Sequence, residues 1–351
     1  MTSSSLQTLR DHIEAWHRRL RDPQRREGAG EGPEHPLEHR LYPPQAAPNL
    51  DAAPDLLRTG DRDATRRALG WIVAAPEIPP GVAQQLIEVA FEQTASSDVT
   101  VKRSAYRVLD TVFEHEPAMV ADHLDTIVDG LGDRYLVVRE VTVDVVEAIL
   151  QRNPGLAGVL YAELLADDQI VRDLALEILI DLADEHPAVL APLRRYLSIQ
   201  LADPDVSRPL LVHAILALRS VDPELLAKAL PTILSWYPTT DEDLESAILD
   251  ATLAVGGLEP EDRSRAVGLF LDYLNRPDPS RKRAVAEWLV ATVTADAQPA
   301  DTVRSWASNS DQWDRVRVAT AVIEAGVSTD HPILEALVAP GDPLADEIRR
   351  V

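Results

Sequence analysis

A basic side chain recurs about every 36 positions along most of this 351-residue chain, in the same local frame each time. The members are Arg66, Lys102, Arg139, Arg172, Arg208, Lys282 and Arg317, with Glu245 in the sixth of the eight places. Self-similarity at a fixed period of this length is typical of proteins built from stacked repeats. Such a stack buries apolar faces between neighbouring repeats and leaves long surfaces free for binding. The pattern therefore favours a binding protein over a catalytic one.

Composition fits an array of closely packed helices. Hydrophobic residues make up 45% of the chain but aromatic residues only 5%, and the abundant Ala and Leu favour helices over strands. The formal net charge is −24, and only three of the 34 basic residues are Lys. This acidic, Arg-rich surface resembles that of haloarchaeal proteins, because high salt screens the self-repulsion of such a charge. A bacterium with a GC-rich genome could produce the same Arg bias.

The absence of cysteine excludes disulfides, thiolate catalysis and cysteine-based zinc sites. The first ten residues have no apolar core of signal-peptide length, and nowhere do 18 apolar residues run uninterrupted. We therefore expect a soluble, cytoplasmic protein that does not enter a membrane.

Three regions follow from the pattern along the chain. Residues 1–27 contain an amphipathic helix, since apolar residues alternate steps of three and four; these are Leu6, Leu9, Ile13, Trp16 and Leu20. Residues 28–50 are rich in Pro and Gly and predict a linker or a strap. Residues 51–351 alternate a shorter and a longer helical pattern. In each pair a Pro opens the first helix, and Asp or Ser residues in the turn cap the second.

This arrangement resembles the HEAT-repeat family, in which an Asp in the turn is followed by an apolar–Arg pair at the start of the second helix. Asp133 and Arg139 are separated by six residues, as are Asp311 and Arg317. Asp167 and Arg172 are separated by five, as are Asp203 and Arg208. The resemblance implies an all-α solenoid of about eight helix pairs with a truncated C-terminal cap. It also implies that the recurring residues form a structural ladder of hydrogen bonds between repeats: Asp133, Arg139, Arg172, Arg208, Asp311 and Arg317. The alternative is a basic stripe that binds phosphates or acidic peptides.

A second register distinguishes one repeat from the next. Positions 2, 3, 6, 7 and 10 after each recurring residue are small or apolar and predict the buried face of the second helix. Position 5 is polar or charged in six consecutive repeats and apolar in both end repeats. By resemblance, this side of the second helices is the concave face of the array. Together with neighbours one turn away, we expect it to bind a partner through Arg103, Arg107, Glu140, Asp144, Glu147, Glu177, Asp181, His213, Asp250 and Glu287. The alternative is a solvated face of a generally acidic protein.

The sequence offers little for catalysis or metal binding. It contains no H-E-x-x-H, P-loop, G-x-G-x-x-G or G-x-S-x-G motif. His35 and His39 lie four residues apart, but Pro36 denies them a shared helical face. The single His115–Glu116 pair does not match the HEAT-like di-iron hydroxylases, which use several such pairs. We therefore expect no enzyme activity, no cofactor and no metal.

Two functions remain open at this point. The first is a scaffold that binds protein partners, including one with a basic segment, while its N-terminal helix either docks on the array or binds a partner. The second is a nucleic-acid-binding or DNA-repair protein that resembles the HEAT-like alkylpurine glycosylases and uses the Arg-rich N-terminal repeats. A HEAT-like lyase that holds a tetrapyrrole is a weaker third resemblance, because no residue here is specific for a chromophore. A continuous positive channel would favour DNA, and a mixed or negative face would favour a scaffold.

Overall fold

A computed structural model describes residues 49–338 except 203, 256, 277–280, 296 and 329, and these described residues form helices and no strand. The chain divides into two compact units, Met1–Ile178 and Leu179–Val351, and the boundary in sequence falls within α12. The predicted N-terminal helix and nearly all of the predicted strap lie outside the described residues.

The N-terminal unit consists of helix pairs joined by short turns. Its elements in chain order are η1 (Leu50–Ala52), α4 (Ala53–Arg58), α5 (Arg62–Val73), α6 (Pro80–Thr94), α7 (Val99–His115), α8 (Pro117–Ala121), α9 (Leu124–Val128), η2 (Asp129–Gly132), α10 (Leu136–Arg152), η3 (Pro154–Val159), α11 (Leu160–Glu163) and the first part of α12 (Gln169–Ala183).

The C-terminal unit continues the same alternation. After the end of α12, its elements are η4 (Pro187–Leu193), α13 (Arg194–Gln200), α14 (Arg208–Ala217), η5 (Leu218–Ser220), α15 (Pro223–Ser235), α16 (Glu242–Ala254), α17 (Pro260–Leu274), α18 (Lys282–Ala295), α19 (Ala297–Asn309), α20 (Gln312–Glu324) and α21 (Pro332–Leu337).

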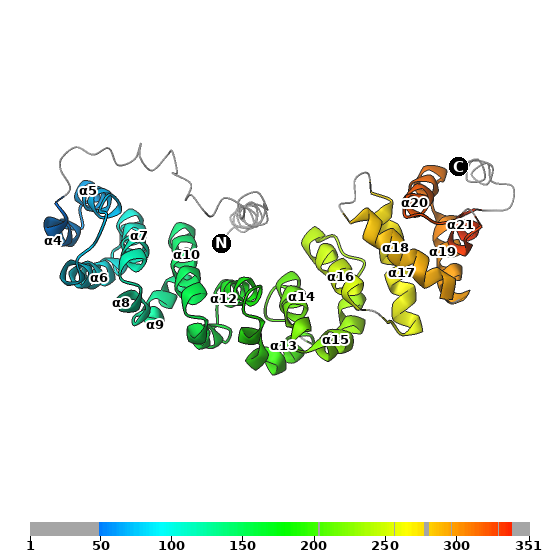
Figure 1. Ribbon diagram of the computed structural model, residues 1–351, viewed down its shortest axis with the longest axis horizontal. Coiled ribbons are helices and arrows are strands. Elements are labelled where there is room, and N and C mark those ends of the chain that lie inside the picture. The colour runs from blue at the N-terminus through cyan, green and yellow to red at the C-terminus, as the bar shows by residue number, and fades with distance from the viewer. Residues whose placement is uncertain are drawn as a thin grey trace. The chain divides into compact units, whose positions relative to one another are not determined.

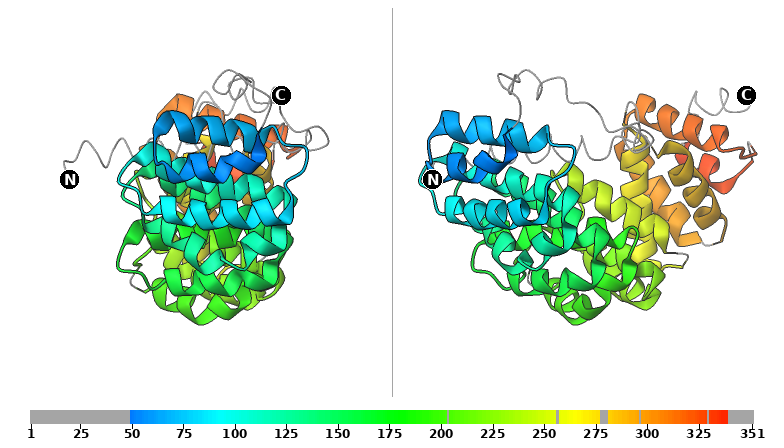
Figure 2. Two further views of the ribbon diagram at one scale, coloured as in Figure 1. Left: turned by 90° about the vertical axis from the view of Figure 1, so that its left-hand side faces the viewer. Right: turned by 60° about the vertical axis from the view of Figure 1, so that its left-hand side comes forward.

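Within each unit the helices form two layers, and we call the helices of each pair A and B in chain order. In the N-terminal unit the B helices α5, α7 and α10 pack on one another in sequence, and the A helices α4 and α6 pack side by side (Figure 1). The blue and cyan helices of the first repeats lie roughly alongside one another in the left panel of Figure 2. In the C-terminal unit α14, α16, α18 and α20 form the B layer, while α15, α17, α19 and α21 form the A layer. The predicted all-α solenoid is confirmed.

The helices begin where the sequence places Pro and Asp. Pro117, Pro154 and Pro187 each stand in the first turn of an A segment, where a backbone N–H has no partner to lose. Asp98 accepts a hydrogen bond of 2.9 Å from the N–H of Thr100 at the start of α7, and Asp311 accepts one of 2.8 Å at the start of α20. These carboxylates satisfy free N–H groups and stabilise the positive end of the helix dipole.

The predicted buried face of the B helices is present. In α10, Val141, Thr142, Val145, Val146 and Ile149 are all buried. The same register buries Ala175, Ile178, Leu179 and Leu182 in α12, whereas Leu174 is half-buried. A stack of this kind buries its apolar surface between repeats, so each B helix depends on its neighbours for stability.

The expected alternation of a shorter and a longer helix holds only for the first five repeats. In the third to fifth repeats the A segment is broken into short α and 3-10 pieces. Gly130, Gly155, Gly158 and Pro192 lie in these segments, and Gly and Pro disfavour a continuous helix. In the last three repeats the A helices are as long as their B partners, for example 13 residues in both α15 and α16.

Gly130 permits a close contact between two repeats. A Cβ atom at this position would overlap Tyr106 Oη from α7 and lie only 2.5 Å from Thr142 Oγ1 on α10. Both neighbours are buried, so they have little room to move. The A segment of the third repeat therefore approaches the second repeat closely only because this residue has no side chain.

We predict that Gly130→Ala lowers the free energy of unfolding by about 1–3 kcal/mol, because overpacking displaces the buried Tyr106 side chain. Gly158→Ala is the matched control, since nothing lies within 4 Å of a Cβ placed there. Urea unfolding of the two variants measures the difference. Equal stability of the two variants would contradict the close contact.

Candidate functional site

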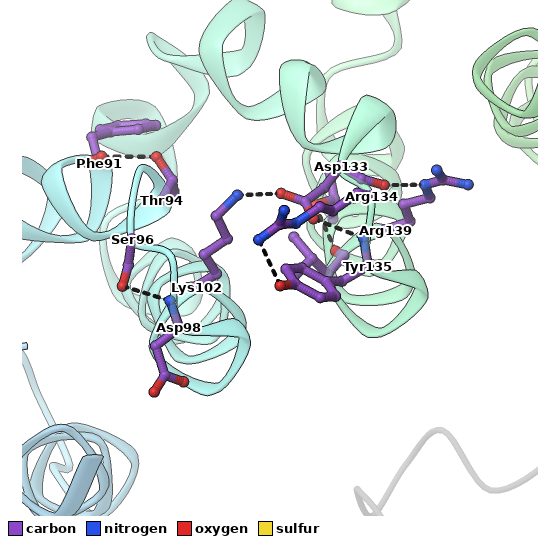
Figure 3. Close-up of polar contacts among 11 residues, drawn as sticks. Phe91, Thr94, Ser96, Asp98, Lys102, Asp133, Arg134, Tyr135 and Arg139 are labelled. Carbon is purple, nitrogen blue, oxygen red and sulfur yellow. Dashed lines mark hydrogen bonds and ion pairs between the residues drawn. The ribbon is translucent and has the colours of Figure 1, made fainter. Parts of the chain in front are cut away.

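The recurring basic residue in the second repeat forms an ion pair with the next repeat. Lys102 extends from α7, and its Nζ lies 2.5 Å from Asp133 Oδ2 in the turn before α10 (Figure 3). Both side chains are largely buried, with 18% and 10% of their surfaces exposed. A buried pair with this geometry links the two repeats, and loss of either partner would leave an uncompensated charge.

Asp133 is held as a carboxylate by its surroundings. Burial alone would raise its pKa, but hydrogen bonds from Lys102 and from the backbone N–H of Tyr135 outweigh it and lower the pKa below its ordinary value. A carboxyl group with a lowered pKa stabilises the folded state above its unfolded pKa, and this contribution is lost as the pH falls through the folded pKa. The turn is therefore an acid-sensitive point in the stack.

Arg139 and Arg172 bind backbone carbonyls of their own repeats. The buried Arg139 donates from Nε to the carbonyl of Asp133, and Arg172 Nη1 donates to the carbonyls of Ala166 and Asp167 at 2.6 and 3.0 Å. The resemblance implied bonds between repeats, whereas the contact of Arg139 lies within its own repeat. The link between Arg172 and the next repeat stays a prediction. In this turn Asp133 makes the link between repeats, and Arg139 closes the turn that presents it (Figure 3).

The other members of the predicted ladder vary in their contacts. Arg317 Nη1 donates to the carbonyl of Asn275 at the end of α17, at 3.1 Å. Arg208 places its guanidinium 5.1 Å from the centre of the Trp236 ring. Arg66 is exposed and lies 3.5 Å from Asp63. Asp311 caps α20 through the N–H of Asp314. Most of the recurring residues thus stabilise turns, caps or neighbouring repeats.

The sixth repeat reverses the charge of the recurring residue. Glu245 is buried, with 6% of its surface exposed, and forms an ion pair with Arg276. One turn later on α16, Asp250 Oδ2 lies 2.6 Å from Arg281 Nη2. Arg281 also donates to Ser246 Oγ at 2.9 Å. Both arginines belong to the turn of the following repeat, so the ion pair between repeats is kept with its signs exchanged.

Sequence reasoning missed Arg276 and Arg281, although a signal was present. Lys102 and Asp133 are 31 residues apart, as are Glu245 and Arg276. A residue near the start of one B helix and the residue 31 positions later, in the turn before the next B helix, are therefore neighbours in both pairs. Counted from a recurring residue, an opposite charge at this offset is visible in the sequence for both pairs.

A charged surface of mixed sign lies on α7 and α10, and we call it the α7–α10 face: Arg103, Arg107, Glu140 and Asp144. Arg103 and Asp144 are exposed, while Arg107 and Glu140 are half-buried. The charges of both arginines act on Asp144, which places the four side chains in one neighbourhood. The fold brings these four predicted contact residues together, and their part in binding stays a prediction.

The charge of Asp144 is only partly compensated by its neighbours. Desolvation raises its pKa, the Glu140 carboxylate raises it further, and Arg107 and Arg103 only partly oppose them, so the net shift is upward. Among the described residues Asp144 has neither a hydrogen-bond partner nor an ion-pair partner. A cation placed beside it would therefore be favourable.

The remaining predicted contact residues are placed differently. Glu147 is half-buried on α10, and Asp181 is exposed on α12. Glu177 is buried, with 6% of its surface exposed, so the expectation that a partner reaches it is wrong. Its register borders the buried stripe, and the packing of α12 covers it. In the C-terminal unit His213 is half-buried, Asp250 is paired with Arg281, and Glu287 Oε1 lies 2.8 Å from Arg283 Nε.

Neither a metal-binding cluster nor a membrane-spanning helix occurs in the described part of the chain. There, no three His, Asp or Glu side chains are grouped so that they could hold a metal ion. The His35–His39 pair lies outside this part. No helix within it combines the length and the apolar character needed to cross a membrane.

Comparisons with known proteins identify the fold. No protein-family model matches the sequence, and no curated protein matches it. A chain in a homology model of the full-length AP-3 complex in an intermediate open conformation is similar, with a TM-score of 0.55 and 16% identity over 86% of this chain and 62% of that chain. The present chain thus spans less than two thirds of that neighbour. The crystal structure of YibA from Escherichia coli aligns with 12% identity over 80% of this chain and 96% of YibA. Its TM-score of 0.44 is too low to establish a shared fold. The similarity to the AP-3 chain shows that this protein has an α-helical repeat fold, and it shows the fold only.

We predict that Glu245→Arg, which restores the basic residue of the other repeats, lowers stability by about 3 kcal/mol. The new guanidinium would be buried beside Arg276 and Arg281. The double variant Glu245→Arg/Arg276→Glu should recover much of the loss. Glu242→Arg, at an exposed position on the same helix, is the control. Urea unfolding midpoints test this, and a stable single variant would contradict the exchanged ion pair.

Proposed function

We propose that this chain is a non-catalytic scaffold of the HEAT-repeat type that binds a protein partner with a basic segment through the α7–α10 face. The observation that carries the proposal is Asp144, an exposed carboxylate with a raised pKa and no ion-pair partner among the described residues. Arg103 and Arg107 beside it add donors for acidic or polar groups of the same partner. The fold supports the proposal, because stacked repeats offer long binding surfaces.

Charge distinguishes this proposal from nucleic-acid binding. DNA recognition depends on neutralising successive phosphates with Lys and Arg. On the α7–α10 face two carboxylates accompany two arginines, so phosphates would meet repulsion as well as attraction. The mixed sign supports a protein partner better than a nucleic acid.

The acidic composition supports a further part of the proposal. With a net charge of −24 and 31 Arg against three Lys, the chain suits a cytoplasm of high salt, as in haloarchaea. High salt weakens exposed ion pairs more than partly buried ones. Of the two carboxylates on the α7–α10 face, the half-buried Glu140 would therefore keep more of its attraction for a basic segment than the exposed Asp144.

We predict that Glu140→Gln/Asp144→Asn reduces recovery of a specific partner at least about tenfold, since each charge-assisted hydrogen bond contributes about 1.5 kcal/mol or more. The variant Glu88→Gln/Glu92→Gln is the matched control, because it removes the same charge from exposed positions on α6. Affinity purification from the native host in high salt, with mass spectrometry of the eluate, measures recovery.

Three results of that experiment would count against the proposal. One is equal recovery of the partner with both variants, which would remove the α7–α10 face from the interface. Another is a partner that has no basic segment. The third is recovery of nucleic acid in place of protein, which would favour the DNA-binding alternative.

A further inference from the structure

The N-terminal region contains a basic tract that stands apart from the rest of this acidic chain. Residues 18–26 include five arginines and a single acidic residue, Asp22. The tract thus carries four net positive charges, obtained as five minus one, in a chain of net charge −24. We call it the Arg tract: Arg18, Arg19, Arg21, Arg25 and Arg26. Such a segment is attracted to any undercompensated carboxylate within its reach.

The α7–α10 face offers such carboxylates. Asp144 and Glu140 lie one helical turn apart on α10, and the Glu140 carboxylate disfavours the charged form of Asp144. Arg103 and Arg107 approach from α7 and leave the pKa of Asp144 raised. Additional guanidinium groups would lower that pKa and form charge-assisted hydrogen bonds with both carboxylates.

The tether allows the Arg tract to reach this face. The described part of the chain begins at Asn49, next to the first repeat. The 22 residues between Arg26 and Asn49 can span up to about 70 Å when extended. α10 is two B helices beyond α5, and packed helices lie about 8–10 Å apart. The tether is therefore several times longer than the two steps along the stack.

We propose that the Arg tract of the same chain occupies the α7–α10 face in the absence of a partner and that a basic partner segment must displace it. This inference rests on the proposed function, because it names the resident competitor of the same site. A tether of about this length gives a local concentration in the millimolar range. The tract is therefore an internal competitor that only a tighter or more extended basic segment overcomes.

Distance measurement in the full chain tests the docking. The absence of cysteine allows spin labels to be placed uniquely at Gln24→Cys and Val137→Cys, the latter exposed on α10. We expect one short, narrow distance by double electron–electron resonance. It should broaden when Glu140→Gln/Asp144→Asn is added and stay unchanged with Glu88→Gln/Glu92→Gln. An equally broad distribution in all three proteins overturns the inference. So does a short distance that disappears on dilution with unlabelled protein, since that contact would join two copies.

A peptide experiment separates failure of this inference from failure of the proposed function. The probe is a synthetic oligo-arginine peptide, added to the full chain and to a variant with all five arginines of the Arg tract changed to Gln. We expect the variant to bind the peptide about tenfold more tightly or better, because its internal competitor is gone. Equal binding by both proteins, lost with Glu140→Gln/Asp144→Asn, overturns the internal docking and leaves the face intact. Binding that is insensitive to Glu140→Gln/Asp144→Asn overturns both.

Discussion

The structure depends on one constraint: no helix pair can bury its apolar face alone, so each must be completed by the next repeat. The turns between A and B helices lie at these junctions, and their polar groups must find partners there. Lys102 and Asp133 meet this need with a largely buried ion pair, and Arg139 satisfies a carbonyl of the same turn. Glu245 and Arg276 meet it with the signs exchanged. At these two junctions the recurring residue forms a pair of opposite charges with the next repeat, in either order.

This requirement separates structural charge from charge that is available for binding. The recurring basic residues are mostly engaged with turn carbonyls, helix ends and neighbouring repeats. The register that lies five positions further along each B helix is freer to vary, and in α10 it holds Asp144 beside Glu140 and two arginines. A scaffold can change its specificity at such a register while the ladder that holds its repeats together is kept. The Arg tract and a basic partner are proposed to compete for this variable register, and neither is proposed to bind the recurring residues.

The sequence was sufficient to predict the fold, because period, Pro placement and Asp caps all act locally. The period of about 36 residues marks where each repeat begins. Within a repeat, Asp98 and Pro117 each specify the start of a helix through nearby backbone groups. The site was only partly predictable, because burial depends on packing between repeats. The same register leaves Asp144 exposed and buries Glu177. The close approach at Gly130 likewise depends on Tyr106, which lies in the preceding repeat.

The most direct test of the central claim is a double-mutant cycle on Lys102→Met and Asp133→Asn, read as free energies of unfolding in urea. Asn at position 133 still accepts a hydrogen bond from the N–H of Tyr135, so the cycle isolates the ion pair. If the pair links the second and third repeats, the two substitutions should show a coupling energy of at least about 1 kcal/mol. Effects that add to within about 0.5 kcal/mol would contradict the claim that this ion pair joins the second repeat to the third.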